Sequence, residues 1–366
     1  MSYMIKVIVA FILSCVLSAL VIPWIINFSE KYRVFDTQDI YRKTHLGLVS
    51  RLGGIAIFFG YFTVLHLYSD LNSLSIHAMA AASAIVFFLG LKDDLLGGAL
   101  PHEKFLIQLL AAIIFVIFNG QGFELDFLSI IIPNLTLLIG FLLSICFLLF
   151  VINSFNFIDG IDGLAGVLGV FINVFIGVHL LNWGDEGFGI SAFIIAGSTT
   201  GFLIYNFIPG KVFMGDSGAM LIGLITGALC LRFFSISISH AEDQYSSPLL
   251  IVFSLLIVPT FDVLRIFIIR ALHRKPMLTG DRNHIHHRLQ DVGLRNLQIV
   301  LILVMFTLSS LTIAILWQHK GFLRIGSVLF LLCLCSNSIL SYLRGCRISS
   351  DYKFSDVLFI DTFNRR

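Results

Sequence analysis

Charged side chains are scarce in this sequence. Asp, Glu, Lys and Arg make up only 13% of its 366 residues, whereas hydrophobic residues make up 57%. A soluble domain normally holds about 25% charged and about 45–50% apolar residues, so this composition excludes an ordinary soluble domain. The formal net charge of +2 is too small to suggest a nucleic-acid partner, and we expect none. The composition indicates a chain that resides in lipid.

Cysteine and long polar connections are also rare. The six cysteines are scattered, and five of them lie within apolar runs. They show no metal-ligand spacing, so we interpret them as small buried apolar residues. The largest polar connection between apolar runs has about 28 residues, which leaves no room for a soluble domain. We therefore expect one integral-membrane domain over 1–343 and a tail over 344–366.

Long apolar runs, by contrast, recur from end to end. Runs of about 18 residues or more are the signature of membrane-spanning helices. The first run lacks a small-residue cleavage site and is followed by further runs, which favours a retained helix. The sequence thus predicts an all-α polytopic membrane protein with about ten to eleven transmembrane helices. The predicted ranges are 5–27, 52–69, 77–92, 104–119, 128–152, 163–182, 188–207, 217–236, 248–270, 299–318 and 322–343.

The polar connections between these ranges differ in charge on the two sides. One set, which includes 29–51 and 271–298, holds nearly all the Lys and Arg residues. The other set holds acids such as Asp185 and Glu186 and almost no basic residue. By the positive-inside rule the first set faces the cytoplasm. The N-terminus is then outside, the C-terminus is inside, and every stretch with catalytic character lies on the cytoplasmic side.

The stretch "NSFNFIDGIDGLAG" (153–166) places four oxygen-bearing side chains between apolar runs. Asn153, Asn156, Asp159 and Asp162 follow at intervals of three, which puts at least two of them on one helical face. Hard oxygen ligands without histidine or cysteine suit Mg²⁺. A helix cap at Asp162 is the structural alternative, and it explains one residue of the four.

Two further acidic stretches stand at the ends of apolar runs. Asp93 and Asp94 in "LKDDLLGG" repel each other, which can raise the pKa of one and suit it to accept a proton. For this pair taken alone, a solvated helix end is the favoured explanation. In "FMGDSGA" (213–219), Asp216 is either a cap for the helix that follows or a metal ligand beside a phosphate-binding helix N-terminus.

Histidine is concentrated in one stretch, "GDRNHIHHRL" (280–289). Clustered histidines can bind zinc, but zinc sites usually have four ligands with wider spacing. The flanking arginines favour a loop that binds phosphate and faces a sugar. The members of this set are Arg282, His284, His286, His287 and Arg288. Carboxylates, amides and basic side chains on one side of the membrane are the requirements of phosphoryl transfer, and the polytopic body suggests a lipid reactant.

In order along the chain, these motifs resemble the polyprenyl-phosphate N-acetylhexosamine-1-phosphate transferases, in particular the WecA/TagO type. The resemblance covers about residues 42–289 and includes "RK.H" before "RLGG", "DD" with "P..K…Q", "N..NF.DG.DGLAG", "F.GD.GA", "P..D" (Pro259, Asp262) and "DR.H.HHRL". One such pattern would be weak evidence, whereas several in register are strong. Two positions depart from the family pattern, because Gly97 replaces a third acid and Ser50 replaces a proline.

The resemblance implies a role for each matching residue. Asp216 and Asn156 are the expected Mg²⁺ ligands, and Asp159 lies beside the metal and the diphosphate. Asp93 and Asp94 are expected to deprotonate or orient the lipid phosphate, and Lys104 to steady a phosphate. The expected substrate-binding set is Lys43, His45, Asn153, Asp162, Arg282, His284, His286, His287 and Arg288. A helix bent near Pro259 would line a groove for the prenyl chain.

The resemblance also implies the reaction and its location. GlcNAc-1-phosphate would move from UDP-GlcNAc to undecaprenyl phosphate, with Mg²⁺ as cofactor, for which Mn²⁺ can substitute. The enzyme would be a multi-pass protein of the bacterial inner membrane, would begin a cell-envelope polysaccharide, and could form a homodimer. Another UDP-N-acetylhexosamine as donor remains open. A transporter, a metal-dependent intramembrane hydrolase and a structural scaffold are less favoured, because the acids lie at one rim and no internal repeat is visible.

Overall fold

The computed structural model describes residues 3–34, 49–68, 73–98, 100–119, 123, 133–207, 210–239, 245–274 and 283–348. Three residues of the predicted site, Lys43, His45 and Arg282, lie outside these ranges. Within the described ranges the chain forms helices and no strand, and one isolated parallel bridge joins Ser50 to Val212. The chain divides into two compact units, Met1–His240 and Ala241–Arg366, which we describe separately.

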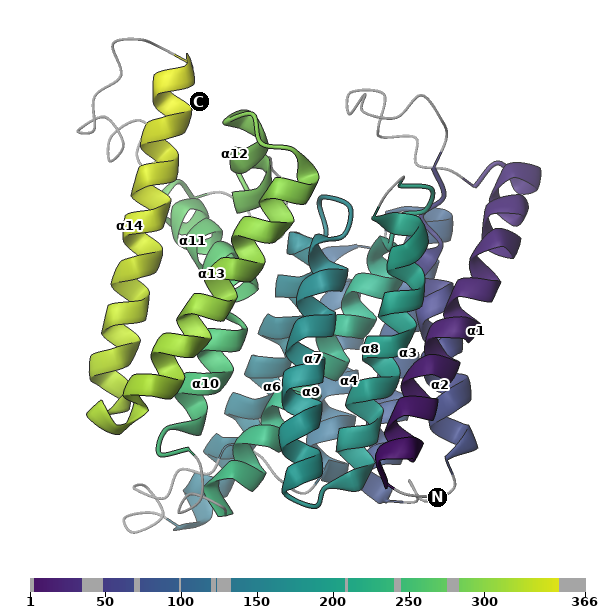
Figure 1. Ribbon diagram of the computed structural model, residues 1–366, viewed down its shortest axis with the longest axis horizontal. Helices are drawn as coiled ribbons and strands as arrows, with labels where there is room; N and C mark the ends of the chain where they lie inside the picture. The colour runs from purple at the N-terminus through teal and green to yellow at the C-terminus, as the bar shows by residue number, and fades with distance from the viewer. Residues whose placement is uncertain are drawn as a thin grey trace. The chain divides into compact units, whose positions relative to one another are not determined.

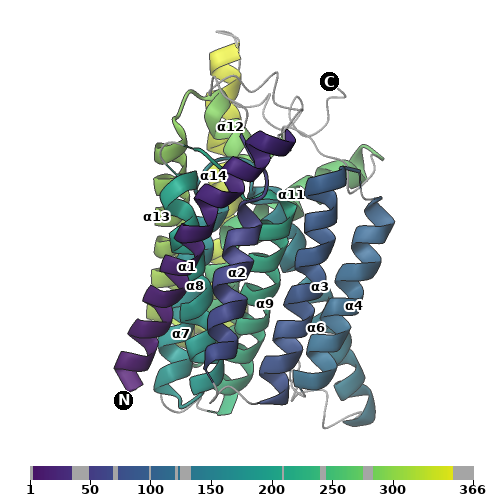
Figure 2. The ribbon, with the colours of Figure 1, turned by 90° about the vertical axis from the view of Figure 1, so that its right-hand side faces the viewer.

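The first unit is a bundle of long helices (Figure 1). Their bounds are α1 Tyr3–Tyr32, α2 Gly53–Leu67, α3 Leu74–Leu96, α4 Pro101–Asn119, α6 Pro133–Ile158, α7 Leu164–Asn182, α8 Glu186–Asn206 and α9 Gly215–Ser239. Helix α9 packs against α2, α3, α6, α7 and α8, and Figure 2 shows it between α2 and α3. It can be this central because it is rich in glycine, and a Cβ at Gly223 would lie 2.9 Å from the Cα of Ile152 on α6. Small residues allow such close backbone approach in membrane helices.

The second unit consists of α10 Pro248–Leu255, α11 Ile257–Leu272, α12 Ile285–Asp291, α13 Asn296–Trp317, the short 3₁₀ helix η2 Gln318–Lys320 and α14 Phe322–Ile348. Helices α10 and α11 meet at a bend of 76°. Pro259 is the third residue of α11 and has no N–H to donate across this break, so its ring is accommodated in the first helical turn. The predicted bent helix is confirmed.

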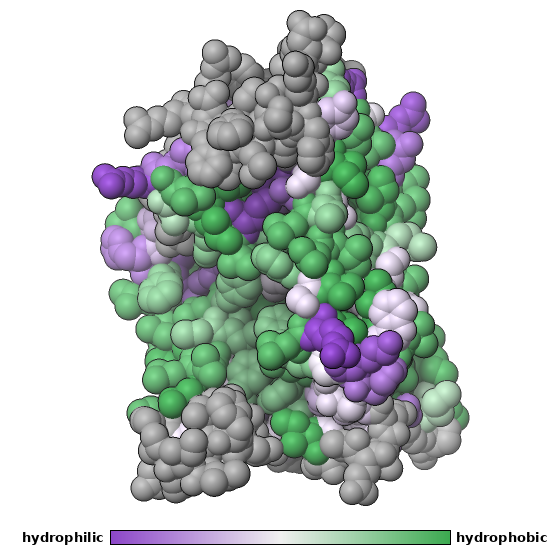
Figure 3. Space-filling model, turned by 90° about the vertical axis from the view of Figure 1, so that its left-hand side faces the viewer, coloured by the Kyte–Doolittle hydropathy of each residue, from purple (hydrophilic) through white to green (hydrophobic). Residues whose placement is uncertain are grey.

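Nine helices in the described part of the chain are long and apolar enough to cross a membrane, and the bent α10–α11 pair makes ten if it forms one span. Helix α2, with 15 residues, is a shorter apolar helix. Large apolar side chains such as Leu323 and Leu331 on α14 are exposed, and Figure 3 shows hydrophobic side chains over most of the coloured surface of one face. Such a surface is suited to acyl chains and not to water. The predicted all-α polytopic membrane fold is confirmed.

Each predicted range overlaps a helix, and the differences lie at the polar ends. Helix α3 continues through Asp93 and Asp94, α6 continues through Asn156, and α9 already includes Asp216. These residues were expected in connections between helices. The predicted range 248–270 divides into two helices, the short α12 was not predicted, and α14 continues past 343 to Ile348.

Candidate active site

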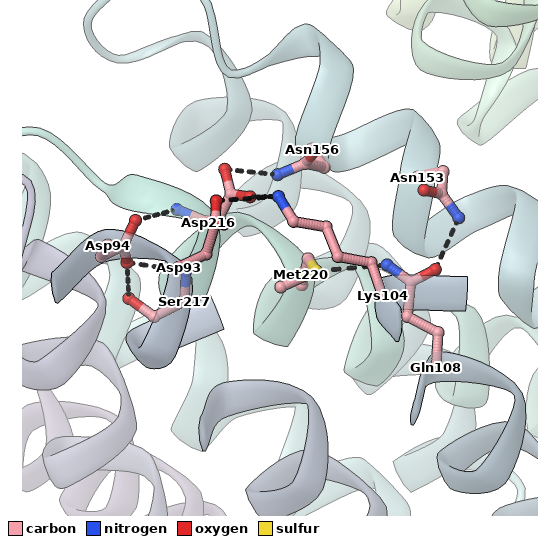
Figure 4. Close-up of polar contacts among 9 residues, drawn as sticks. All are labelled: Asp93, Asp94, Lys104, Gln108, Asn153, Asn156, Asp216, Ser217 and Met220. Atoms are coloured by element: carbon pink, nitrogen blue, oxygen red, sulfur yellow. Dashed lines mark hydrogen bonds and ion pairs between the residues drawn. The ribbon is translucent and has the colours of Figure 1, made fainter. Parts of the chain in front are cut away.

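Carboxylate, amide and ammonium groups from four helices meet at one end of the first unit (Figure 4). The Lys104 ammonium on α4 lies 2.6 Å from Oδ2 of Asp216 on α9 and 2.8 Å from Oδ2 of Asp93 on α3. The side-chain amide of Asn156 on α6 donates to Oδ1 of Asp216 at 3.0 Å. The structure thus brings together Asp93, Lys104, Asn156 and Asp216, four residues that lie up to 123 positions apart in the sequence.

Asp94 has a different set of partners from its neighbour Asp93. Its Oδ1 accepts from the backbone N–H of Asp216 at 2.8 Å, and its Oδ2 accepts from the N–H and the hydroxyl of Ser217 at 3.0 and 2.6 Å. The first N–H groups of a helix have no partner within the helix, so they can donate to a carboxylate. The helix dipole also stabilises a negative charge at this end. Asp94 therefore caps α9 from another helix, so Asp216 lies in the first turn of α9 and is not its cap.

The "RLGG" motif fixes the segment that leads into α9. The N–H groups of Gly53 and Gly54, at the start of α2, donate to the carbonyls of Phe213 and Met214 at 3.0 and 2.9 Å. A Cβ at Gly54 would lie 2.3 Å from the N of Gly218, so only glycine permits this approach of α2 to α9. Two motifs that are far apart in the sequence thus form one backbone-to-backbone contact behind the acidic cluster.

The turn between α6 and α7 carries Asp159 and Asp162. The pKa of the Asp159 carboxyl lies well above its usual range, first because the group is removed from water and then because the carboxylates of Asp216, Asp162 and Asp94 are nearby. Gly163, with a φ of 84°, is the N-cap residue of α7. The interpretation of Asp162 as the cap of this helix is therefore wrong.

Asn206, at the end of α8, joins this turn to the segment before Asp216. Its Oδ1 accepts from the N–H of Gly163 at 2.8 Å, and its Nδ2 donates to the carbonyl of Val212 at 2.8 Å. The side chain is buried, so each polar atom needs a partner and both loops supply one. This amide holds the two acidic loops at a fixed separation.

Asn153 lies one helical turn before Asn156, and its side-chain amide donates hydrogen bonds to groups inside the helix bundle. Its Nδ2 donates to Oε1 of Gln108 at 2.9 Å and to the carbonyl of Leu149 at 2.7 Å. Gln108 is buried and in turn donates to the sulfur of Met220 at 3.2 Å. This line of polar contacts joins α4, α6 and α9 beneath the acidic cluster, as Figure 4 shows. The predicted substrate contact of Asn153 stays a prediction.

The predicted histidine stretch lies in the second unit and is organised by Asp262 on α11. Its Oδ2 is 2.8 Å from Nδ1 of His284, and its Oδ1 accepts from the N–H of Ile285 at 2.9 Å. Arg265 also donates to Oδ1, at 3.1 Å. The rings of His284 and His286 lie nearly parallel with centroids 5.8 Å apart. Asp262 is buried, so the positive and polar groups around it stabilise its charge.

Comparison with known proteins gives the family. A family model described as glycosyl transferase family 4 matches residues 76–234. A protein of Bacillus subtilis (strain 168), named probable undecaprenyl-phosphate N-acetylglucosaminyl 1-phosphate transferase, is 32% identical over 327 residues, which cover 86% of this chain and 87% of the relative. The chain belongs to glycosyl transferase family 4.

Two further members of the family support this assignment. A decaprenyl-phosphate N-acetylglucosaminephosphotransferase of Mycolicibacterium smegmatis is 32% identical over 297 residues, which cover 72% of this chain and 71% of the relative. An undecaprenyl-phosphate alpha-N-acetylglucosaminyl 1-phosphate transferase of Escherichia coli O157:H7 is 26% identical over 304 residues, covering 80% and 79%. The region that the family model matches contains the whole acidic cluster around Asp216.

The acidic cluster has the chemistry that a divalent metal of this family would need. Asp216 and Asn156 offer hard oxygen atoms, and the Lys104 ammonium already places one positive charge between two carboxylates. Within the described residues, no three His, Cys, Asp or Glu side chains form a complete metal site. Mg²⁺ is usually bound through one or two carboxylates with substrate phosphates and water as the other ligands, so a partial protein set is appropriate. The residues present fit Mg²⁺.

The two departures from the family pattern have local structural roles. Gly97, with a φ of 66°, is the C-cap of α3, and its N–H donates to the carbonyl of Asp93 at 2.8 Å. The hydroxyl of Ser50 lies 2.6 Å from that of Ser29 on α1 and accepts from the N–H of Leu52 at 3.2 Å. Gly97 therefore ends the helix that carries Asp93 and Asp94, and Ser50 fixes the backbone just before the "RLGG" motif.

The interpretation of the sequence missed several residues that hold the site. Asn206 and Ser217 had only a weak signal, namely an amide at the end of an apolar run and a serine inside a motif. Asp262 was noted in "P..D" without a role. Their importance comes from contacts over long sequence separations, which spacing along the chain does not reveal.

Proposed function

We propose that this protein transfers GlcNAc-1-phosphate from UDP-GlcNAc to undecaprenyl phosphate, giving undecaprenyl-diphosphate-GlcNAc and UMP. The observation that carries the proposal is the cluster in which Lys104 bridges Asp93 and Asp216, next to Asn156. Such a cluster offers both a cation site and a positive group for phosphate, which phosphoryl transfer requires. The names of the relatives support a polyprenyl phosphate as acceptor.

We infer a direct displacement, which a cluster with a cation site and a positive group for phosphate supports. An oxygen of the lipid phosphate attacks the β-phosphorus of UDP-GlcNAc, a P–O bond forms, and the bond to the bridging oxygen breaks as UMP leaves. Bound Mg²⁺, held by Asp216 and Asn156, would supply charge neutralisation for the diphosphate. Lys104 is placed to leave its carboxylate partners for a phosphate oxygen, and its charge stabilises the transferred group.

The carboxylates are then assigned by what they touch. Asp93 orients Lys104, while Asp94 keeps Asp216 in place through the N-terminus of α9. A lipid phosphate is already an anion, so the attack needs little help from a general base. This favours direct attack over a two-step route through an aspartyl phosphate. Asp159, whose pKa is raised in part by the nearby carboxylates of Asp216, Asp162 and Asp94, would lie beside the bound metal and the diphosphate.

The location follows from the charge distribution. We infer that the connections that carry the motifs face the cytoplasm, because they hold nearly all the Lys and Arg residues. The proposed location is the inner membrane of a bacterium, in line with the bacterial relatives. Donor alternatives are UDP-GalNAc and related UDP-N-acetylhexosamines, because the roles proposed for the acidic cluster concern the metal and the phosphates and not the sugar. A homodimer is an expectation from family resemblance alone.

The test uses purified protein in detergent with undecaprenyl phosphate and radiolabelled UDP-GlcNAc, with Mg²⁺ or with EDTA. We expect label in the lipid fraction only with Mg²⁺, and a loss of at least about a hundredfold in Asp216→Asn, because the main charge that would hold the metal is removed. Glu103→Gln is the matched control, since Glu103 is an exposed carboxylate paired with Lys92 next to Lys104. Label from another UDP-sugar alone would change the donor, and no lipid product from any UDP-sugar would favour a transporter.

A further inference from the structure

One face of α14 is polar along its last three turns. Asn337, Ser341, Arg344 and Arg347 follow at intervals of three or four, so they lie along the same side of the helix. The rest of α14 is mostly apolar, and many of its large side chains are exposed. Polar groups on a membrane helix are costly unless they have partners. The partners of this polar face therefore indicate its purpose.

The partners lie on α12, the short helix that carries His286 and His287. Arg288 donates to the side-chain oxygen of Asn337 at 2.5 Å and also to the Ser341 hydroxyl. Arg344 forms an ion pair with Asp291 at 2.9 Å. Figure 1 shows α12 beside the end of α14.

A last contact extends this row beyond the end of α12. Arg347 donates to the carbonyl of Val292, the residue that follows the helix. The contacts with α14 therefore run from Arg288 in the middle of α12 to Val292 just after it.

The burial of Arg288 decides what its charge does. Its side chain is only 2% exposed, and both terminal nitrogens of its guanidinium donate to neutral groups of α14. An arginine that binds a phosphate needs its planar donor fork directed at the ligand. Here the two terminal nitrogens are directed at α14. The resemblance places Arg288 among the substrate-binding residues, and this geometry does not favour that role.

The other end of the histidine stretch is held independently. Asp262 accepts from the N–H of Ile285, the first residue of α12, and binds Nδ1 of His284. The stretch is therefore fixed by α11 before the helix and by α14 along it. Side chains that must meet a substrate with little freedom need this kind of support.

We propose that the polar face of α14 positions the histidine helix α12, and that Arg288 is a positioning residue that acts through Asn337 and Ser341. The proposal rests on the proposed function only in assuming that the histidines of α12 meet the substrate. The C-terminal helix is then part of the catalytic machinery, although none of its side chains needs to touch a reactant.

The test compares the two sides of this contact. Arg288→Gln removes the charge, and Asn337→Leu with Ser341→Ala removes the acceptors. We expect each to lower kcat for transfer from UDP-GlcNAc by about ten- to a hundredfold, because small misplacements of substrate-contacting groups have effects of this size. The variant that combines all three changes should lose little more, because both sides belong to one interaction. Ser338→Ala is the control, since its exposed hydroxyl donates only to Leu334 on the same helix and should have no effect.

Amide hydrogen exchange of residues 285–291 in detergent gives a readout that does not need activity. Faster exchange in both altered proteins, with the wild-type rate in Ser338→Ala, is the expected result. A raised KM for UDP-GlcNAc in Arg288→Gln alone, with the α14 variants unchanged in kinetics and exchange, would overturn the proposal and return Arg288 to the substrate. If wild-type protein transfers nothing, the proposed function fails, while the exchange experiment still decides the role of α14.

Discussion

Adjacent residues with the same side chain have different tasks at this site. Asp93 and Asp94 were expected to act as a pair on the lipid phosphate. In the structure the carboxylate of Asp93 accepts a hydrogen bond from the Lys104 ammonium. Asp94 instead accepts three hydrogen bonds from the first turn of α9. The sequence shows only that two carboxylates are side by side. Which helix each one faces depends on the packing of α3 against both α4 and α9.

This difference gives a prediction for the two Asn variants. Asp94→Asn keeps one acceptor oxygen but leaves a donor opposite the N–H or hydroxyl of Ser217, so we expect the free energy of unfolding to fall by about 1–3 kcal/mol. Asp93→Asn loses a partly exposed ion pair with Lys104, which is worth about 0–1 kcal/mol. In detergent, the melting temperature of Asp94→Asn should therefore be well below those of Asp93→Asn and wild type. Equal melting temperatures for the two variants would contradict the capping role of Asp94.

Asp159 makes a prediction about pH. Its pKa is raised by burial and by neighbouring carboxylates, so the folded state binds its proton more tightly than the unfolded state does. Stability from this group is therefore present at low pH and is lost as the pH rises from the ordinary Asp value through the raised pKa. In EDTA, wild-type protein should lose stability as the pH rises above the ordinary Asp range, and Asp159→Asn should lose less and melt at a higher temperature at the upper end of the pH series.

The control for this pH prediction is Asp185→Asn. Asp185 caps α8 and pairs with Arg232, away from the acidic cluster. Its removal should lower the melting temperature, because α8 loses its cap and Arg232 loses its partner. A slope with pH in Asp159→Asn equal to that of the wild type would contradict the raised pKa of this carboxyl.

At the scale of the helix, apolar runs were sufficient to predict where the long helices lie. A run of apolar residues predicts a buried or lipid-facing helix because the backbone must satisfy its own hydrogen bonds in lipid. The ends were less predictable: Asn156 and Asp216 interrupt the apolar pattern, yet they are helical because they bind each other across α6 and α9. Helix α12 was missed because its polar residues have their partners on α11 and α14.

The contact between α2 and α9 gives a prediction at this scale. Replacing Gly54 with Ala would put a Cβ 2.3 Å from Ser217 Oγ and from the backbone N of Gly218, so α2 must move away from the start of α9. We expect a lower melting temperature and at least about a tenfold loss of transfer, since Asp216 moves with that turn. Gly326→Ala on α14 is the control, because a Cβ there meets nothing. A Gly54→Ala protein with wild-type activity would show that this contact does not fix the site.

At the scale of the whole chain, the count of spans can be checked against the charge pattern. From the N-terminus to the turn at Gly184 the described helices are α1, α2, α3, α4, α6 and α7, an even number if each crosses the membrane. From there to the C-terminus α8, α9, the bent α10–α11 pair, α13 and α14 make an odd number. The N-terminus and the 184 turn are then on one side, and the C-terminus and the acidic cluster are on the other.

The positive-inside rule makes this arrangement a prediction with a direction. Basic residues such as Arg274 and Arg295 belong to the same side as the C-terminus, so that side should be cytoplasmic. A green fluorescent protein fused after residue 366 should fluoresce, and alkaline phosphatase fused after residue 184 should be active in the periplasm. The exchanged pair of fusions, phosphatase after 366 and fluorescent protein after 184, is the control and should be silent. If the same reporter were active at both positions, one of the spans after residue 184, such as the bent α10–α11 pair, would not cross the membrane.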